Sequence, residues 1–497
     1  MNPSSPLRKF ATGSYFLVLD NLVNFVIGAV FWLVLAKMVD PVSIGQSMVV
    51  VAFATTIIGF FGYGIQLTLE KYISEYNARN MPHTSRRLLK SAIKMSLIMS
   101  GCAALVVTLI SPQLATTAYH DESISRLLVL IILTYFPSQT VIAVLVGAFV
   151  GAHMAKYAVL GDFIFQISRI ALVAVMAMSN IGAFGILVSF SISSALALAI
   201  SYFYSLPRAL PKLDSKDEAN EANEGIRHLI KFSGLNYFAV GLRTATAQIG
   251  VLVLATQNFE WAAFYGLAAL ISKVVGASSF SVSGALLPAA SEQLIKGDKV
   301  ELSKMIDTAI RLSIFISGFS FTILVLEPSY FLNLISYAYI GGASALRILV
   351  IMSMNYAVSA IFTSLLNASN RMVDVAKIEI VSSVIVIVLT FILIPTIGLE
   401  GAALAMLIGS VCTLILSLAA IKREQKLSIS VTNLLKPIVP IAVALTVGYI
   451  LIIAEGTMVG LVATIVAYII SSLIYGVIKK NELRELFGIV MHSAKSR

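Results

Sequence analysis

The chain is poor in charge and in cysteine. Only 12% of its 497 residues are charged, whereas an average soluble domain is roughly 25% charged, so a water-soluble enzyme of this size would lack polar surface and is excluded. The two cysteines, Cys102 and Cys412, both lie in apolar segments, which excludes a disulfide scaffold. The five histidines show no ligand spacing, and the sequence contains neither a Walker loop nor an HExxH motif. We therefore expect no cofactor, no metal site and no catalytic residues, in a protein that is not an enzyme.

Long apolar runs dominate the remaining sequence. Hydrophobic residues make up 58% of the chain, and charge-free runs include 41–69, 127–155, 170–207 and 401–421. A membrane-spanning helix needs about 20 mostly apolar residues, and these runs are continuously apolar rather than alternating as in a membrane barrel. The sequence therefore predicts an all-α polytopic membrane protein with about fourteen spans: 13–36, 43–67, 92–112, 126–150, 157–180, 182–205, 232–256, 261–287, 309–328, 343–367, 374–396, 400–421, 435–454 and 457–478.

Lysine and arginine are unevenly divided among the predicted loops. With the N-terminus placed in the cytoplasm, 29 of the 35 Lys and Arg residues fall in cytoplasmic segments and three in outer loops. The other three, Arg169, Arg243 and Lys273, fall within spans. The positive-inside rule then predicts a multi-pass cell-membrane protein with both termini in the cytoplasm. The net charge of +10 indicates contact with anionic membrane lipids rather than nucleic acid, because no soluble basic domain is present.

The two halves of the chain resemble each other. Residues 92–96 (AIKMS) match 309–313 (AIRLS) at an offset of 217, Glu75 matches Glu292 at the same offset, and 181–185 match 397–401 at an offset of 216. Six spans per copy give both copies the same orientation in the membrane. We predict two six-helix lobes related by a parallel repeat: an N-lobe at 1–205, a cytoplasmic linker at 206–231, a C-lobe at 232–422, and at 423–497 an added helix pair with a cytoplasmic tail.

Several motifs resemble those of the polysaccharide flippases. The stretch LAKMVDPVSIG at 35–45 resembles the family's LARxLGPxxFG, and GYG at 62–64 leads into the charged stretch EKYISEY at 70–76. The stretch LIPTIGLEGAALA at 393–405 matches the family's LIPxxGxxGAAxA. The resemblance covers about residues 10–422. It departs at Lys37 and Asp40, which stand where the family has Arg and Gly, and at Gln248, where many relatives carry Asp.

This resemblance implies a function and a mechanism. The family belongs to the multidrug/oligosaccharidyl-lipid/polysaccharide exporter superfamily, whose members work by alternating access around a cavity between two lobes. Its Wzx-like branch implies a polyprenyl- or dolichyl-(pyro)phosphate-linked oligosaccharide as cargo, moved from the cytoplasmic to the outer leaflet. Glycan-assembly enzymes would then be possible partners, and we expect a monomer. Three alternatives stay open: a multidrug or cation antiporter of the same superfamily, a membrane glycosyltransferase or polymerase, and a non-transporting scaffold for glycan enzymes.

Charged residues within spans are the first candidates for the site. A charge near the bilayer centre costs about 2.5–3.5 kcal/mol on insertion scales. Three cations, Arg169, Arg243 and Lys273, against one anion, Asp20, leave the membrane interior net positive, which favours a phosphorylated headgroup. The alternatives are an ion pair between Arg243 and Asp20, snorkelling or pairing of Lys273, a structural role for Arg169, and gating by protonation of Asp20.

Amides within spans are the second group. Their side chains can line a path for sugar hydroxyls, although hydrogen bonding between helices is their commoner use in membranes. The predicted cargo-contacting amides are Gln66, Asn236 and Gln248.

Overall fold

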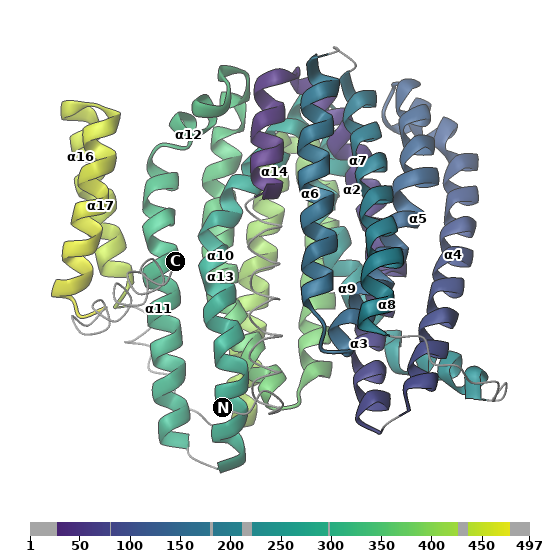
Figure 1. Ribbon diagram of the computed structural model, residues 1–497. Coiled ribbons are helices and arrows are strands. Elements are labelled where there is room, and N and C mark those ends of the chain that lie inside the picture. The colour runs from purple at the N-terminus through teal and green to yellow at the C-terminus, as the bar shows by residue number, and fades with distance from the viewer. Residues whose placement is uncertain are drawn as a thin grey trace. The chain divides into compact units, whose positions relative to one another are not determined.

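The computed structural model describes residues 27–79, 81–178, 182–210, 221–296, 299–425 and 436–477, and these ranges contain helices and no strand. A helix at Ile27–Met38 precedes the labelled elements of Figure 1. The elements that follow are α2 (Pro41–Phe61), α3 (Tyr63–Ala78), α4 (Pro82–Gln113), η1 (Leu114–Ala118), α5 (Ser123–Gly151), α6 (Lys156–Met178), α7 (Gly182–Ala199), η2 (Ile200–Ser205), α8 (Leu206–Ala209), α9 (Glu221–Leu254), α10 (Phe259–Lys296), α11 (Lys299–Leu326), α12 (Pro328–Ile335), η3 (Tyr337–Gly342), α13 (Ala343–Ala368), α14 (Met372–Gln425), α16 (Ile438–Glu455) and α17 (Thr457–Ile474).

Eleven helices of the described ranges are long and apolar enough to cross a bilayer. Large apolar side chains remain exposed along several of them, such as Leu109 (71% exposed) on α4 and Ile453 (69%) on α16. In water such surfaces would be unfavourable, whereas lipid tails solvate them. The prediction of an all-α polytopic membrane protein is confirmed.

The number of spans depends on how α14 is counted. Its 54 residues would extend about 80 Å at 1.5 Å per residue, more than twice the roughly 30 Å of a hydrocarbon core. Gly398, with φ 62° and ψ −130°, breaks it at the turn predicted between the spans at 374–396 and 400–421. Two shorter apolar helices are also present: Ile27–Met38 overlaps the predicted first span, and Phe238–Leu254 lies within the predicted seventh. The count of fourteen stays a prediction.

Replacing Gly398 with alanine is expected to destabilise the protein by about 1–3 kcal/mol, because its backbone lies in a region that is open essentially to glycine alone. A Cβ atom there would also lie 3.2 Å from Trp261 Cζ3. Gly101→Ala is the matched control, since a Cβ at Gly101 meets nothing within 4 Å. Thermal unfolding in detergent should separate the two variants, and equal melting temperatures would contradict the argument.

The internal repeat is visible in the local backbone. His153 (φ 57°) and Asn370 (φ 59°), 217 residues apart, both adopt positive φ at the turn before the next span. The surrounding hydrogen bonds repeat as well: Met154 N donates to Phe149 O (2.8 Å), and Arg371 N donates to Leu366 O (2.9 Å). The later matched turn repeats too, with Gly182 at φ 59° and Gly398 at φ 62°.

Side-chain pairs repeat at the same offset. Glu75 accepts a hydrogen bond from Arg79 at 2.6 Å, and Glu292 accepts one from Lys296 at 2.5 Å, so both copies carry an i,i+4 ion pair at the same place. Ser96 and Ser313 are both buried, and each hydroxyl lacks a hydrogen-bond partner among the described residues. These correspondences support the repeat predicted from 92–96 and 309–313.

The chain divides into two compact units. Unit 1 comprises 1–267 and 390–399, and unit 2 comprises 268–389 and 400–497. Unit 1 therefore includes α9 and the first part of α10, which the predicted lobes assign to the second half. In unit 1 a buried apolar cluster joins α3, α4, α5 and α6, with Ile65, Leu69 and Phe149 among its fully buried members. That the N-lobe (1–205) and the C-lobe (232–422) are the parts that move against each other stays a prediction.

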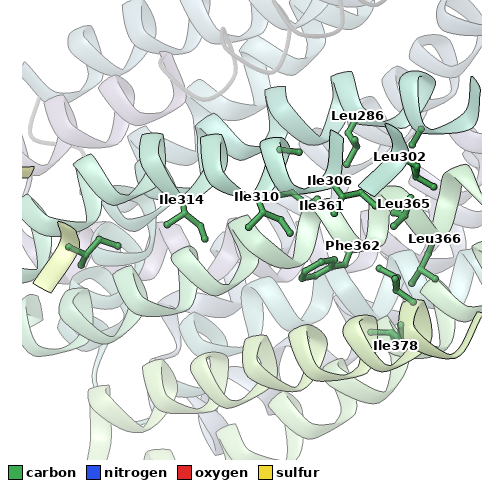
Figure 2. Close-up of a cluster of buried hydrophobic side chains, with 14 of the residues drawn as sticks. Leu286, Leu302, Ile306, Ile310, Ile314, Ile361, Phe362, Leu365, Leu366 and Ile378 are labelled. Carbon is green, nitrogen blue, oxygen red and sulfur yellow. The ribbon is translucent and has the colours of Figure 1, made fainter. Parts of the chain in front are cut away.

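Unit 2 has its own core. Figure 2 shows Leu286 of α10, Ile306 and Ile310 of α11, and Ile361 and Phe362 of α13 facing one another in this cluster. The added pair α16–α17, joined through Gly456 (φ 95°), also belongs to unit 2 and docks on α11. Tyr468 donates from its hydroxyl to Phe315 O at 2.8 Å.

Candidate substrate-binding site

In unit 1, α9 packs on α2 and α3 through small residues. A Cβ atom at Gly59 would lie 2.5 Å from Thr244 Cβ, and one at Gly241 would lie 2.2 Å from Phe60 Cδ1. Contacts this short do not occur between real side chains, so the two helices approach each other only because these positions are glycine. The close packing fixes α9, the helix that carries three of the predicted site residues.

The start of α10 packs on α2 in the same way. A Cβ at Gly45 would lie 1.9 Å from Phe259 O. Near this contact Gln46 Nε2 donates to Asp121 Oδ2 at 2.7 Å, and Tyr119 stacks on Phe259 with ring centroids 6.2 Å apart. Burial raises the pKa of Tyr119 to about 12. This cluster was not predicted, because its members lie far apart in the sequence.

Arg243 lies on α9 with an exposed side chain, and Gln248 follows on the same helix with a half-buried one. Within the described ranges no carboxylate pairs with Arg243. Asn236 also lies in α9, but its side chain is outside the described set. Asp20, the alternative partner of Arg243, lies outside the described residues. The prediction that Arg243 contacts cargo therefore stays a prediction.

Lys273 lies on α10 in unit 2, and its side chain is exposed. No carboxylate of the described residues forms an ion pair with it. Gln66 lies on α3, where its Nε2 donates to Glu70 Oε1 at 3.0 Å, one turn further along the same helix. A cargo hydroxyl would have to compete with this intrahelical bond.

Arg169 lies in a cage of aromatic rings. Its guanidinium carbon is 3.9 Å from the ring centroid of Phe31, 4.7 Å from that of Phe190 and 5.1 Å from that of Phe165. The side chain is 6% exposed, and one Nη2 hydrogen is donated to Gln166 Oε1 at 2.5 Å. The cage joins Ile27–Met38, α6 and α7. Because ring faces attract a desolvated cation, the arrangement favours the structural alternative for Arg169.

The sequence contained one signal of this cage. Phe165 and Arg169 are four residues apart on a predicted helix and therefore share a face. Phe31 and Phe190 come from other spans, and only the tertiary fold brings them to the guanidinium. Asp40 was noted only as a departure from the family motif. Its Oδ2 accepts from Ser43 N at 2.8 Å and caps α2, a role that the Asp-Pro start could have indicated.

The cage predicts a measurable coupling between Arg169 and Phe31. A double-mutant cycle of Arg169→Met and Phe31→Leu is expected to give an interaction energy of about 1–2 kcal/mol, as for a desolvated cation–π pair. Phe149, which packs on Tyr157 instead, serves as the control partner. Melting temperatures in detergent provide the readout. Equal coupling of Arg169 to Phe31 and to Phe149→Leu would refute the cage.

The described ranges define a polytopic, all-helical membrane protein. The sequence matches the family described as "Polysaccharide biosynthesis protein" over residues 10–294, more than half of the chain. The chain belongs to this family, as its motifs predicted.

Curated proteins resemble this chain in sequence over most of its length. The chain is 23% identical over 519 residues to the stage V sporulation protein B of Bacillus subtilis, covering 96% of this chain and 98% of that protein. It is 22% identical over 404 residues to an uncharacterized membrane protein of Methanocaldococcus jannaschii, MJ1068, covering 75% of this chain and 76% of that one.

Solved structures share the fold. The lipid II flippase MurJ in an inward closed conformation matches with a TM-score of 0.74 at 14% identity, covering 92% of this chain and 98% of that one. An inward-facing multidrug resistance MATE transporter matches with a TM-score of 0.66 at 13% identity, covering 83% and 99%. At these identities the likeness establishes the fold alone.

Proposed function

We propose that the protein moves a polyprenyl- or dolichyl-(pyro)phosphate-linked oligosaccharide from the cytoplasmic to the outer leaflet. Family membership supports a role in polysaccharide biosynthesis. The observation that carries the proposal is a pair of cations in predicted spans, Arg243 and Lys273, whose side chains are exposed and form no ion pair within the described ranges. Each would face the insertion cost of a charge in hydrocarbon unless water or an anion solvates it.

A phosphorylated headgroup suits these two residues. An arginine can donate two parallel hydrogen bonds to a phosphate, and a lysine can offer a phosphate a compact positive charge. The lipid tail of the cargo would stay in the bilayer while its polar headgroup crosses between the lobes. Rocking of 1–205 against 232–422 would expose the headgroup to each side in turn. The half-buried amides Gln66 and Gln248 are proposed to meet sugar hydroxyls.

The competing function is export of drugs or lipophilic cations, which the shared fold of the MATE transporter makes relevant. Such cargo would be attracted by acids and repelled by Arg243 and Lys273. We further propose that the protein acts as a monomer in the cell membrane, with both termini in the cytoplasm, and performs no catalysis itself.

A transport assay distinguishes the two cargo classes. Proteoliposomes would receive a fluorescent polyprenyl-phosphate sugar, the corresponding uncharged polyprenol glycoside, or a lipophilic cation, and leaflet exchange would be followed by quenching. We expect exchange of the phosphorylated lipid only. Movement of the cation without movement of the phosphorylated lipid would overturn the proposal in favour of the antiporter.

A further inference from the structure

Along one face of α4, exposed cations near the Pro82 end are followed by exposed apolar side chains. Lys90 and Lys94 are exposed near the Pro82 end of the helix, with the half-buried Arg87 on the turn before them. The same face then continues as exposed apolar surface, formed by Leu97 (50% exposed), Ile98 (57%), Leu105 (64%), Val106 (54%) and Leu109 (71%). The opposite face packs on α3, α5 and α9, and Figure 1 shows α4 beside α5.

Helical spacing places these residues in one stripe. Positions 87, 90, 94, 97, 101 and 105 recur at intervals of three or four residues and therefore follow one side of the helix, and Ile98 lies four residues after Lys94 on the same side. At Gly101 a Cβ atom would meet nothing within 4 Å, so no described part of the chain covers the stripe at that point. The exposed surface thus runs without interruption from cations to apolar side chains.

Among the described residues, no carboxylate neutralises the charge of Arg87, Lys90 and Lys94 at the Pro82 end of α4. The helix contains neither Asp nor Glu. Elsewhere the exposed cations Lys296, Lys304 and Arg371 each pair with a neighbouring carboxylate. Next to the three residues, the half-buried Arg86 leaves its Nη1 without an acceptor among the described residues.

We propose that the foot of α4, defined by Arg87, Lys90 and Lys94, binds the phosphate of an anionic phospholipid whose acyl chains lie along the apolar stripe above it. Charge selects an anion, and the continuous apolar surface favours an anion that carries acyl chains, because those chains can pack on the side chains directly next to the cations. Each such cation near an anionic headgroup strengthens binding by about fivefold. The site lies on the face of α4 turned away from the other helices of unit 1, so it does not depend on the proposed transport function.

Native mass spectrometry of the intact protein tests the site. The protein would be exposed to equimolar phosphatidylglycerol and phosphatidylcholine with identical acyl chains, and retained lipids would be counted. The test variant is Arg87→Gln/Lys90→Gln/Lys94→Gln. The control is Lys296→Gln/Lys304→Gln/Arg371→Gln, which removes the same charge from residues that already have partners. Melting temperatures would establish that both variants are folded, and Lys90→Gln/Lys94→Gln would replace the triple variant if it were not.

We expect the wild-type protein and the control to retain phosphatidylglycerol preferentially, and the test variant to lose this preference at least about tenfold. Glycerol phosphate, which carries no acyl chain, should displace none of the bound lipid. An unchanged preference in the test variant, an equal loss in the control, or displacement by glycerol phosphate would each overturn the proposal. This experiment does not measure transport. A failure of the lipid-binding proposal can therefore be distinguished from a failure of the proposed transport function.

Discussion

Replacing Arg243 and Lys273 together with glutamine is expected to lower the transport rate of a lipid-linked phosphate sugar by about a hundredfold or more. A hydrogen bond between charged groups contributes about 1.5–3 kcal/mol, and two such contacts to the phosphates would be lost. The melting temperature should not fall, because removing charges from spans also removes their desolvation cost. Lys296→Gln/Arg371→Gln, which alters two exposed cations outside the apolar windows of the spans, should transport normally.

This experiment also separates cargo binding from the ion-pair alternative. If Arg243 served only to pair with Asp20, Arg243→Gln would leave a carboxylate unpaired in the membrane and lower the melting temperature, and Asp20→Asn would restore it. If Arg243 binds cargo instead, adding Asp20→Asn to the Arg243→Gln variant should not restore its transport. Unchanged transport in the double variant would contradict the proposed role of both cations.

Replacing Gly59 with leucine is expected to abolish transport and to lower stability by about 1–3 kcal/mol or more, as for an overpacked interface. The three nearest atoms to a Cβ at Gly59 all belong to the Thr244 side chain, at 2.5–2.8 Å, so α9 must move away from α2. Gly101→Leu, which faces open space, should leave both transport and melting temperature unchanged.

A second substitution tests the physical reason. Gly59→Ala alone should reduce transport several-fold, and Thr244→Gly should restore it, because that change removes the three atoms nearest to the new methyl group. Failure of Thr244→Gly to rescue Gly59→Ala, with both variants folded, would mean that the helix contact does not control the activity. Transport in proteoliposomes and thermal unfolding in detergent supply the two readouts.

Much of the fold could be predicted from the sequence, because bilayer thickness sets the length of each apolar run. The predicted span at 343–367 is α13, Ala343–Ala368, and the turn expected near 398 is the backbone break at Gly398. Polar extensions could not be predicted this way: α4 begins at Pro82, ten residues before the predicted start, and α11 begins at Lys299. These turns lie beyond the apolar runs, where hydropathy carries no signal.

The site was less predictable, because its contacts join spans that lie far apart in the sequence. A lone arginine in a span indicates function by default, but Arg169 meets Phe31 and Phe190, which only the packing of three helices brings together. The contact between Gly59 and Thr244 depends in the same way on which helices become neighbours. The role of a residue that acts on its own helix, such as the N-cap Asp40, could have been predicted from the sequence.

Solvent access to positions 243 and 273 tests the central claim most directly, namely that the two cations face a hydrated path for a phosphorylated headgroup. Arg243→Cys and Lys273→Cys would be made in a background lacking Cys102 and Cys412, and treated in membranes with a charged, membrane-impermeant thiol reagent. The account predicts that both cysteines react and that a polyprenyl-phosphate sugar slows the reaction, whereas a lipid-facing control, Leu105→Cys, stays unreactive. Unreactive cysteines at 243 and 273, or reaction rates indifferent to the cargo, would contradict it.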